Sequence, residues 1–328
     1  MTRLLQHDLF KLFLFITASF VGAALFAPHL YAWGKDLAAT HGPYHGEIVF
    51  LDEPVRWLAE KCDGSRFSRF FNRSLMACAL VFLFPLIKSL RSKDGEQQEK
   101  KPLAQRLNPG ARGWKELLLG LGFSAGFLTL LVALLYQFGW VETAGDFVFA
   151  KAFQKAIIPA IIVSLLEEWL FRGVLFGVLA RKLKVVPNIV GLSLFFAAVH
   201  FLSPPDGASV EDPRQVWAGF EMLGLIGQKF LTAAEFFGVF MTLFTVGATL
   251  AYTRYVTGRL WFAIGLHAGW VFSLKFTNRL TNPTGEGRSI WYNDSLMDGL
   301  LPLLTLLLTA GCIALYFKKC PPCDRPES

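Results

Sequence analysis

Between Ala156 and Ala180 the sequence reads Ala156-Ile-Ile-Pro-Ala-Ile-Ile-Val-Ser-Leu-Leu-Glu167-Glu168-Trp-Leu-Phe-Arg172-Gly-Val-Leu-Phe-Gly-Val-Leu-Ala180. A helix of this length can cross the ~30 Å hydrocarbon core of a bilayer. Its interior nevertheless carries two carboxylates and one guanidinium. Each such charge costs at least about 2.5–3.5 kcal/mol at mid-membrane. The stretch therefore predicts a transmembrane helix that retains charged groups for structural or chemical reasons.

The rest of the chain fits the same environment. Of 328 residues, 53% are hydrophobic and 17% are charged, whereas soluble domains carry about 25% charged residues. The apolar runs are continuous rather than alternating, which excludes a β-barrel. We expect an all-α polytopic membrane protein with about eight transmembrane helices, at Leu9–Ala27, Leu75–Leu90, Leu117–Phe138, Ala156–Ala180, Pro187–Ser203, Phe236–Tyr252, Leu260–Phe276 and Leu300–Phe317.

The basic residues indicate orientation rather than a nucleic-acid partner. The net charge is +7, but lysines and arginines occur in short clusters beside apolar runs, as membrane topology demands. They form no basic face interleaved with stacking aromatics, which excludes nucleic acid as a partner. Their distribution predicts that both termini are cytoplasmic. No eukaryotic targeting signal is visible, and we expect a bacterial cytoplasmic (inner) membrane.

One segment has the composition of a linker and divides the chain. It begins Arg91-Ser-Lys-Asp-Gly-Glu-Gln-Gln-Glu-Lys-Lys-Pro and is polar and charged. The predicted organisation is a two-span N-terminal region at 1–112, with its basic linker at 91–112, a six-span core at 113–317 and a cytoplasmic tail at 318–328. The first apolar run is predicted to be an anchor, because no small-x-small cleavage site follows it.

Two histidines accompany the charged residues of the fourth run. Glu168 and Arg172 are four residues apart and share a helix face, so they can pair. Glu167 points about 100° away from them. His200 and His267 lie in the fifth and seventh runs. Glu167 and His200 each lie 13 residues from the cytoplasmic end of their runs, which places both about 20 Å above the same surface.

These residues permit two kinds of hydrolytic site. A desolvated glutamate can act as a base, a neutral histidine can help to polarise water, and a second histidine can donate to an oxyanion. Alternatively, Glu167, His200 and His267 match the ligand set of a catalytic zinc ion. The residues leave both alternatives open, zinc and no cofactor. A purely structural reading, a buried ion pair that fixes helix packing, accounts for Glu168 and Arg172 but not for Glu167.

Three motifs in order resemble the CAAX prenyl protease type II family, whose bacterial branch is the CAAX protease and bacteriocin-processing family. They are Glu167-Glu-x-x-x-Arg172, Phe196-x-x-x-His200, and Leu-Trp-x-x-Ile-Gly-Leu-His-Ala-Gly-Trp at 260–270. The similarity covers about residues 113–317. It implies an intramembrane endopeptidase that cleaves prenylated, lipidated or C-terminally anchored proteins, with the bilayer and such a substrate as its partners.

The resemblance also implies roles for single residues. Glu167 would activate water, His200 would hold that water, and His267 would belong to the oxyanion hole. Glu168, Arg172 and Phe196 match positions expected to support the site. The resemblance leaves a metalloprotease and a metal-free glutamate mechanism as alternatives.

One position departs from the family pattern. The last motif implies Asn or Asp at position 271, where this chain has Val271. Loss of one oxyanion donor costs about 2.7–4 kcal/mol in other enzymes. Asn278 shares the helix face but lies about 16 Å away from His267 along the helix axis. This departure leaves open a catalytically weak relative that acts as a scaffold or immunity protein. A proton-coupled transporter also stays open, because acid–histidine relays occur in pumps.

Overall fold

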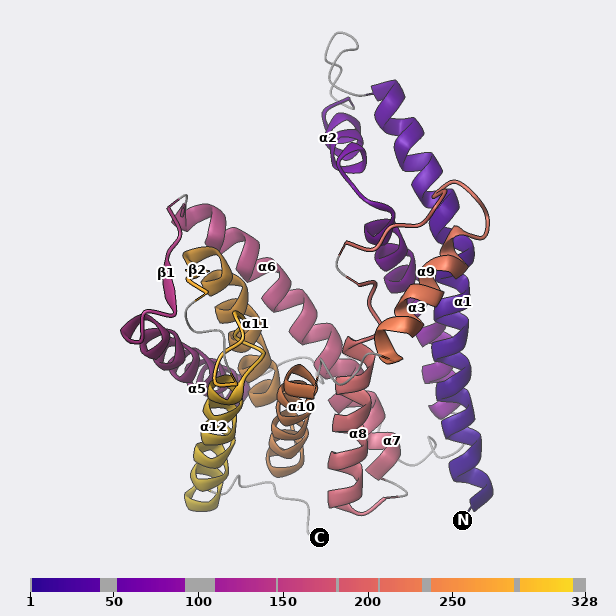
Figure 1. The fold of residues 1–328 in the computed structure, drawn as a ribbon. Helices are drawn as coiled ribbons and strands as arrows, with labels where there is room; N and C mark the ends of the chain where they lie inside the picture. The colour runs from indigo at the N-terminus through magenta and orange to yellow at the C-terminus, as the bar shows by residue number, and fades with distance from the viewer. Residues whose placement is uncertain are drawn as a thin grey trace. The chain divides into compact units, whose positions relative to one another are not determined.

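The computed structural model describes residues 2–41, 52–91, 110–145, 147–180, 183–205, 207–231, 237–285 and 290–320. The predicted all-α class is confirmed. The described strands are β1 (Val141–Thr143) and β2 (Thr281–Pro283), which pair antiparallel with Val141 opposite Pro283. The chain divides into two compact units, residues 1–98 with 201–233 and residues 99–200 with 234–328. Figure 1 shows the ribbon.

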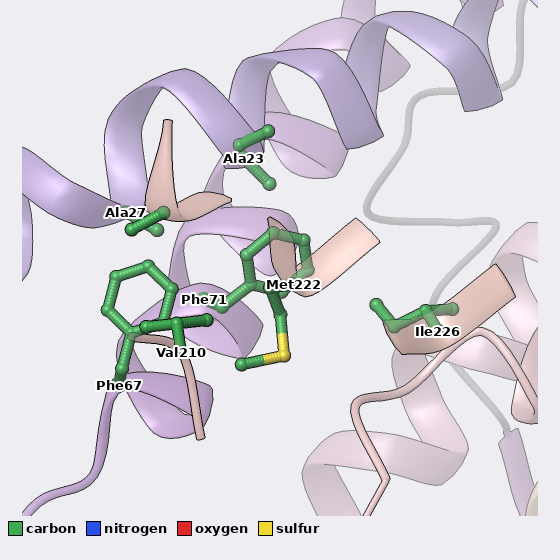
Figure 2. Close-up of a cluster of buried hydrophobic side chains, with 9 residues drawn as sticks. Ala23, Ala27, Phe67, Phe71, Val210, Met222 and Ile226 are labelled. Carbon is green, nitrogen blue, oxygen red and sulfur yellow. The ribbon is translucent and has the colours of Figure 1, made fainter. Parts of the chain in front are cut away.

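Unit 1 contains α1 (Thr2–His41), α2 (Asp52–Asp63), α3 (Phe67–Arg91) and α9 (Ala218–Leu231). Its core lies where α1, α3 and α9 meet, around Phe67, Phe71 and Met222 (Figure 2). Gly219 lets α9 approach α1 closely, since a Cβ at this position would overlap the backbone of Ala24. Residues 201–233 thus fold with the N-terminal region, although they follow α8 in sequence.

Unit 2 holds every residue of the predicted site. Its elements are α5 (Gly110–Gln137), β1, α6 (Phe149–Glu168), a π-helical segment η1 (Trp169–Leu175), α7 (Phe176–Ala180), α8 (Val185–His200), α10 (Phe237–Thr257), α11 (Trp261–Leu280), β2 and α12 (Leu300–Lys319). Leu250, Phe262, Leu266 and Ile313 form a buried cluster that joins α10, α11 and α12.

Five described helical segments are long and apolar enough to cross a membrane: Phe10–His41, Phe67–Leu86, Gly110–Gln137, Phe149–Ala180 and Leu300–Lys319. The chain is therefore an integral membrane protein. The remaining three predicted runs are also helical, as α8, α10 and α11, and α8 is a shorter apolar helix. The total of eight spans and the cytoplasmic termini stay predictions.

The predicted domain boundaries also stay predictions. Most of the predicted linker at 91–112, residues 92–109, lies outside the described residues. The same holds for most of the predicted tail at 318–328, since residues 321–328 are not described.

In unit 2, α5 packs closely against α11. A Cβ at Gly265 would overlap the carbonyl oxygen of Leu117, and one at Gly269 would overlap Ser124 Oγ. On the α5 side, a Cβ at Gly120 would overlap the carbonyl oxygen of Phe262. Small residues four apart on both helices thus bring the backbones together, as membrane helices commonly do. His267 lies between the two α11 glycines, so this packing fixes its depth.

Gly265→Ala is expected to destabilise the protein by about 1–3 kcal/mol, because the added methyl group forces two packed backbones apart. Thermal unfolding in detergent measures this loss. Gly126→Ala on the same α5 helix is the matched control, since a Cβ at Gly126 meets no atom within 4 Å. Because alanine has a higher helix propensity than glycine, the Gly126→Ala variant should be as stable as the wild type or more stable. Equal stability of the two variants would show that the α5–α11 contact is looser than described.

Candidate active site

The site begins where α6 changes into a π-helical turn. α6 ends at Glu168, and η1 continues over Trp169–Leu175. The N–H of Phe176 donates to the carbonyl of Phe171, five residues earlier. Such wide turns inside α-helices occur frequently at functional sites. Here the turn directly follows Glu167 and Glu168, so both carboxylates project from its boundary.

Glu168 and Arg172 form a buried ion pair, and both residues are 0% exposed. Arg172 Nη1 donates to Glu168 Oε1 at 2.9 Å. Nη2 donates to the carbonyl of Gly247 on α10 at 3.1 Å. The guanidinium also lies 4.6 Å from the ring centroid of Phe196 on α8. One arginine therefore connects three helices, and the pairing predicted from sequence is present.

The same Glu168 oxygen also holds a catalytic candidate. His267 Nδ1 donates to Glu168 Oε1 at 2.8 Å. Because Glu168 is fixed by Arg172, the imidazole of His267 is fixed in turn, and its Nε2 is the free ring nitrogen. A carboxylate behind a histidine sets both the orientation and the tautomer of the ring.

His200 is oriented by its own helix. Its Nδ1 donates to the carbonyl of Phe196 at 2.8 Å, which leaves Nε2 as the free ring nitrogen. The ring centroids of Phe196 and His200 are 4.4 Å apart. The ring of Phe196 also meets that of His267 edge-on, with the centroids 6.2 Å apart. Phe196 is buried and touches both histidines and Arg172, in keeping with a supporting position.

The two free nitrogens face Glu167. Glu167 Oε2 lies 3.9 Å from His200 Nε2 and 3.9 Å from His267 Nε2. Glu167 Oε2 is buried and has no hydrogen-bond partner among the described residues. The side chains of Glu167 and His200 are 28% and 31% exposed, whereas that of His267 is 6% exposed. The structure thus brings all three predicted residues together, with Glu167 Oε2 facing both Nε2 atoms.

Comparison with protein families identifies the segment that builds this site. Residues 149–273 match the family described as Type II CAAX prenyl endopeptidase Rce1-like. This match confirms the predicted resemblance, over a narrower range than the predicted 113–317. It spans Glu167, His200 and His267 together with their supporting residues. No curated protein and no solved structure matches the chain.

The donor set does not fit a zinc ion in this geometry. Zinc bonds of 2.0–2.1 Å in a tetrahedral shell place an oxygen and a nitrogen ligand about 3.3 Å apart. The two O–N separations here are 3.9 Å. Among the described residues, no group of three or more His, Cys, Asp or Glu side chains could hold a metal ion. We therefore assign no chemical step to a metal.

Sequence reasoning did not identify three contacts of the site. The four-residue spacing predicts the pairing of Glu168 with Arg172, but no sequence pattern predicts its bond to His267, which lies 99 residues away. The acceptor at Gly247 is a backbone carbonyl, and every residue has one, so the sequence does not mark it. Arg254 Nε donates to the carbonyl of Arg172 at 3.3 Å, within the π-helical turn. In sequence Arg254 resembles an ordinary basic residue at the end of a span.

The residue that departs from the family motif lies on α11 with His267. Val271 is half-buried and one helical turn beyond the histidine. Asn278 is exposed and lies about 16 Å from His267 along the axis. Asn278 is therefore too far from His267 to contribute to the site, and Val271 has no hydrogen-bond donor in its side chain.

Arg172→Ala is expected to fold poorly, because Glu168 would remain as a buried carboxylate without its cation, at a cost of about 3–5 kcal/mol. Yield and melting temperature in detergent measure the effect. The double variant Glu168→Gln/Arg172→Met removes both charges and keeps an acceptor for His267. It should recover most of the lost stability. If the single and double variants are equally unstable, the ion pair is not the source of the loss.

Proposed function

We propose that this protein is an intramembrane endopeptidase that hydrolyses peptide bonds through a water activated by Glu167. The convergence of Glu167 Oε2 with the Nε2 atoms of His200 and His267, each at 3.9 Å, carries the proposal. The family match at residues 149–273 supports peptide hydrolysis as the reaction class. No serine or cysteine nucleophile takes part in the proposed chemistry.

The proposed reaction assigns one role to each group. Glu167 accepts a proton from water, and His200 Nε2 accepts a hydrogen bond from the same water and orients it. The water oxygen adds to the peptide carbonyl carbon, and the carbonyl oxygen becomes an oxyanion. The proton on Glu167 then passes to the departing amine nitrogen as the C–N bond breaks. Each proton removed from water is returned to a product.

His267 is proposed to stabilise the oxyanion by donating from Nε2. Its Nδ1 hydrogen is already bound by Glu168, so donation from Nε2 requires the protonated ring.

The proposed substrate is a membrane-associated protein, prenylated, lipidated or anchored near its C-terminus. Glu167 comes from a segment long and apolar enough to span the bilayer, and His200 from the short apolar helix α8. A peptide must enter the membrane to reach them. A lipid group or an apolar anchor lowers the free energy of that entry, at about 0.8 kcal/mol for each buried CH₂.

Glu167→Gln should lower the cleavage rate by more than 10³-fold, or about 4 kcal/mol, with little change in yield or melting temperature. The amide keeps the size and polarity of the side chain but cannot accept the proton. Peptide cleavage by the purified protein, with lipidated peptide libraries as substrates, measures the rate.

Glu142→Gln, an exposed site on β1, is the matched control and should retain full activity. Wild-type activity should also survive dialysis against a chelator. A Glu167→Gln enzyme as fast as wild type would remove Glu167 from the site. Loss of activity with the chelator, reversed by zinc, would replace the metal-free mechanism with a zinc-dependent one.

Val271→Asn is expected to raise activity 10- to 100-fold, or about 1.4–2.7 kcal/mol. The new amide lies four residues beyond His267 and shares its helix face, so it can donate to the same oxyanion. Both proteins are assayed on one substrate. Equal, robust activity would show that the wild-type site already has its donors. Absence of cleavage in both, with a substrate that a related protease cleaves, favours the scaffold alternative.

A further inference from the structure

A basic stripe lies at the start of α3 in unit 1. Arg66 directly precedes α3, and Arg69 and Arg73, four residues apart, share one face of the helix. All three are exposed. The candidate membrane span of α3 begins at Phe67, so two of the arginines lie inside the first two turns of a segment that crosses the bilayer.

The opposite face of these turns is fully used for packing. Phe67, Phe70 and Phe71 are buried. The ring of Tyr31 on α1 meets those of Phe67 and Phe70 edge-on, with centroid distances of 5.7 and 5.2 Å. Figure 2 shows Phe67 and Phe71 within the cluster that joins α1, α3 and α9. This packing fixes the rotation of α3, and the three guanidinium groups therefore point out of the unit's core.

Within the described part of the chain, none of the three guanidiniums has an ion-pair partner. The neighbouring Arg214 differs, because it pairs with Asp36 at 2.8 Å. The carboxylate of Glu221 is also engaged, as it accepts the backbone N–H of Glu211 at 3.1 Å. The positive charge of the stripe is thus not neutralised by the described residues around it.

The depth of the stripe matches that of lipid phosphates. Arg66 and Arg73 are seven residues apart, about 10 Å along the helix. The headgroup layer of each leaflet is about 5–7 Å thick outside the ~30 Å core. Arg66 and Arg69 therefore lie at headgroup depth, and Arg73, about 9 Å into the span, can extend its long side chain towards the same layer. The predicted topology places this end on the non-cytoplasmic side, where arginine is usually depleted, so orientation of the chain does not account for the stripe.

A cavity of about 400 Å³ opens beside the first arginine, within the size range of small-molecule sites. Its lining combines one cation and polar backbone with apolar side chains: Arg66, Phe67, Gly207, Ala208, Ser209, Val210 and Pro213. Gly207 has a φ of 76°, which allows the loop to turn tightly above the helix. A cavity with one charged end and apolar walls suits an amphiphile with an anionic head.

We propose that unit 1 binds the headgroup of an anionic phospholipid, with its phosphate at Arg66 in this cavity and further headgroup contacts along Arg69 and Arg73. Guanidinium groups bind phosphate through paired N–H donors. The site lies in a different unit from Glu167 and its histidines, and its occupancy does not depend on proteolysis. The bound lipid would stabilise the junction of α1, α3 and α9.

The test measures thermal unfolding of the purified full-length protein in a neutral detergent. Dioleoylphosphatidylglycerol is the probe, and dioleoylphosphatidylcholine and inorganic phosphate are added in parallel. A ligand that binds only the folded state raises the melting temperature with its concentration. We expect phosphatidylglycerol to raise it, and phosphatidylcholine and inorganic phosphate to leave it unchanged.

The variant Arg66→Gln/Arg69→Gln/Arg73→Gln should need at least tenfold more phosphatidylglycerol for the same shift. The matched control is Arg259→Gln/Lys318→Gln/Lys319→Gln, which removes the same number of exposed positive charges from unit 2. It should respond as the wild type does. If the triple variant does not fold, Arg66→Gln alone serves, with co-purified lipid counted by native mass spectrometry.

Three outcomes would overturn the proposal. One is equal stabilisation by phosphatidylcholine, which shows that the lipid's charge is not recognised. Another is an undiminished response of the arginine variants, or an equal loss in the control, which places the effect outside the stripe. The third is equal stabilisation by inorganic phosphate, which assigns the arginines to a soluble anion rather than to a lipid.

Discussion

The buried Glu168 carboxylate is the interaction on which the site depends. One of its oxygens accepts hydrogen bonds from Arg172 and from His267, and Arg172 continues to the carbonyl of Gly247. Through these bonds a single carboxylate holds α6, α10 and α11 together in unit 2. A buried carboxylate requires such partners, since an isolated charge in a low-dielectric interior costs several kcal/mol. The need to neutralise Glu168 therefore determines where His267 lies.

This arrangement separates two neighbouring glutamates with the same chemistry. Glu168 is fully buried and its Oε1 binds Arg172 and His267, whereas Glu167 is part-exposed and faces two ring nitrogens. The angle of about 100° between successive helical residues sends the two carboxylates in different directions. The π-helical turn over Trp169–Leu175 begins at this point, and Arg254 on α10 donates to a carbonyl within it. A carboxylate held by an ion pair thus lies directly beside one that faces both histidines.

Close backbone packing supplies the second constraint. Gly265 and Gly269 bring α11 against α5, and Gly247 approaches Ser193 and Phe196 of α8. In lipid no hydrophobic effect holds helices together, so short backbone distances and buried polar contacts take its place. The positions of Glu167, His200 and His267 therefore depend on glycines that carry no functional group. Unit 1 combines α9, from residues 201–233, with the N-terminal helices, and Arg66, Arg69 and Arg73 are exposed at the start of its α3.

Some features could be predicted from the sequence alone because they depend on short-range patterns. Apolar length predicted the helices, and the four-residue spacing of Glu168 and Arg172 predicted their pairing. Charged and imidazole side chains within apolar runs have a high free-energy cost and are often functional, which indicated Glu167, His200 and His267 as candidates. Other features depended on contacts between residues far apart in the chain. The bond between Glu168 and His267, the Gly247 carbonyl as an acceptor, the role of Arg254 and the packing of α9 with α1 and α3 follow no sequence period, because helix packing in three dimensions decides them.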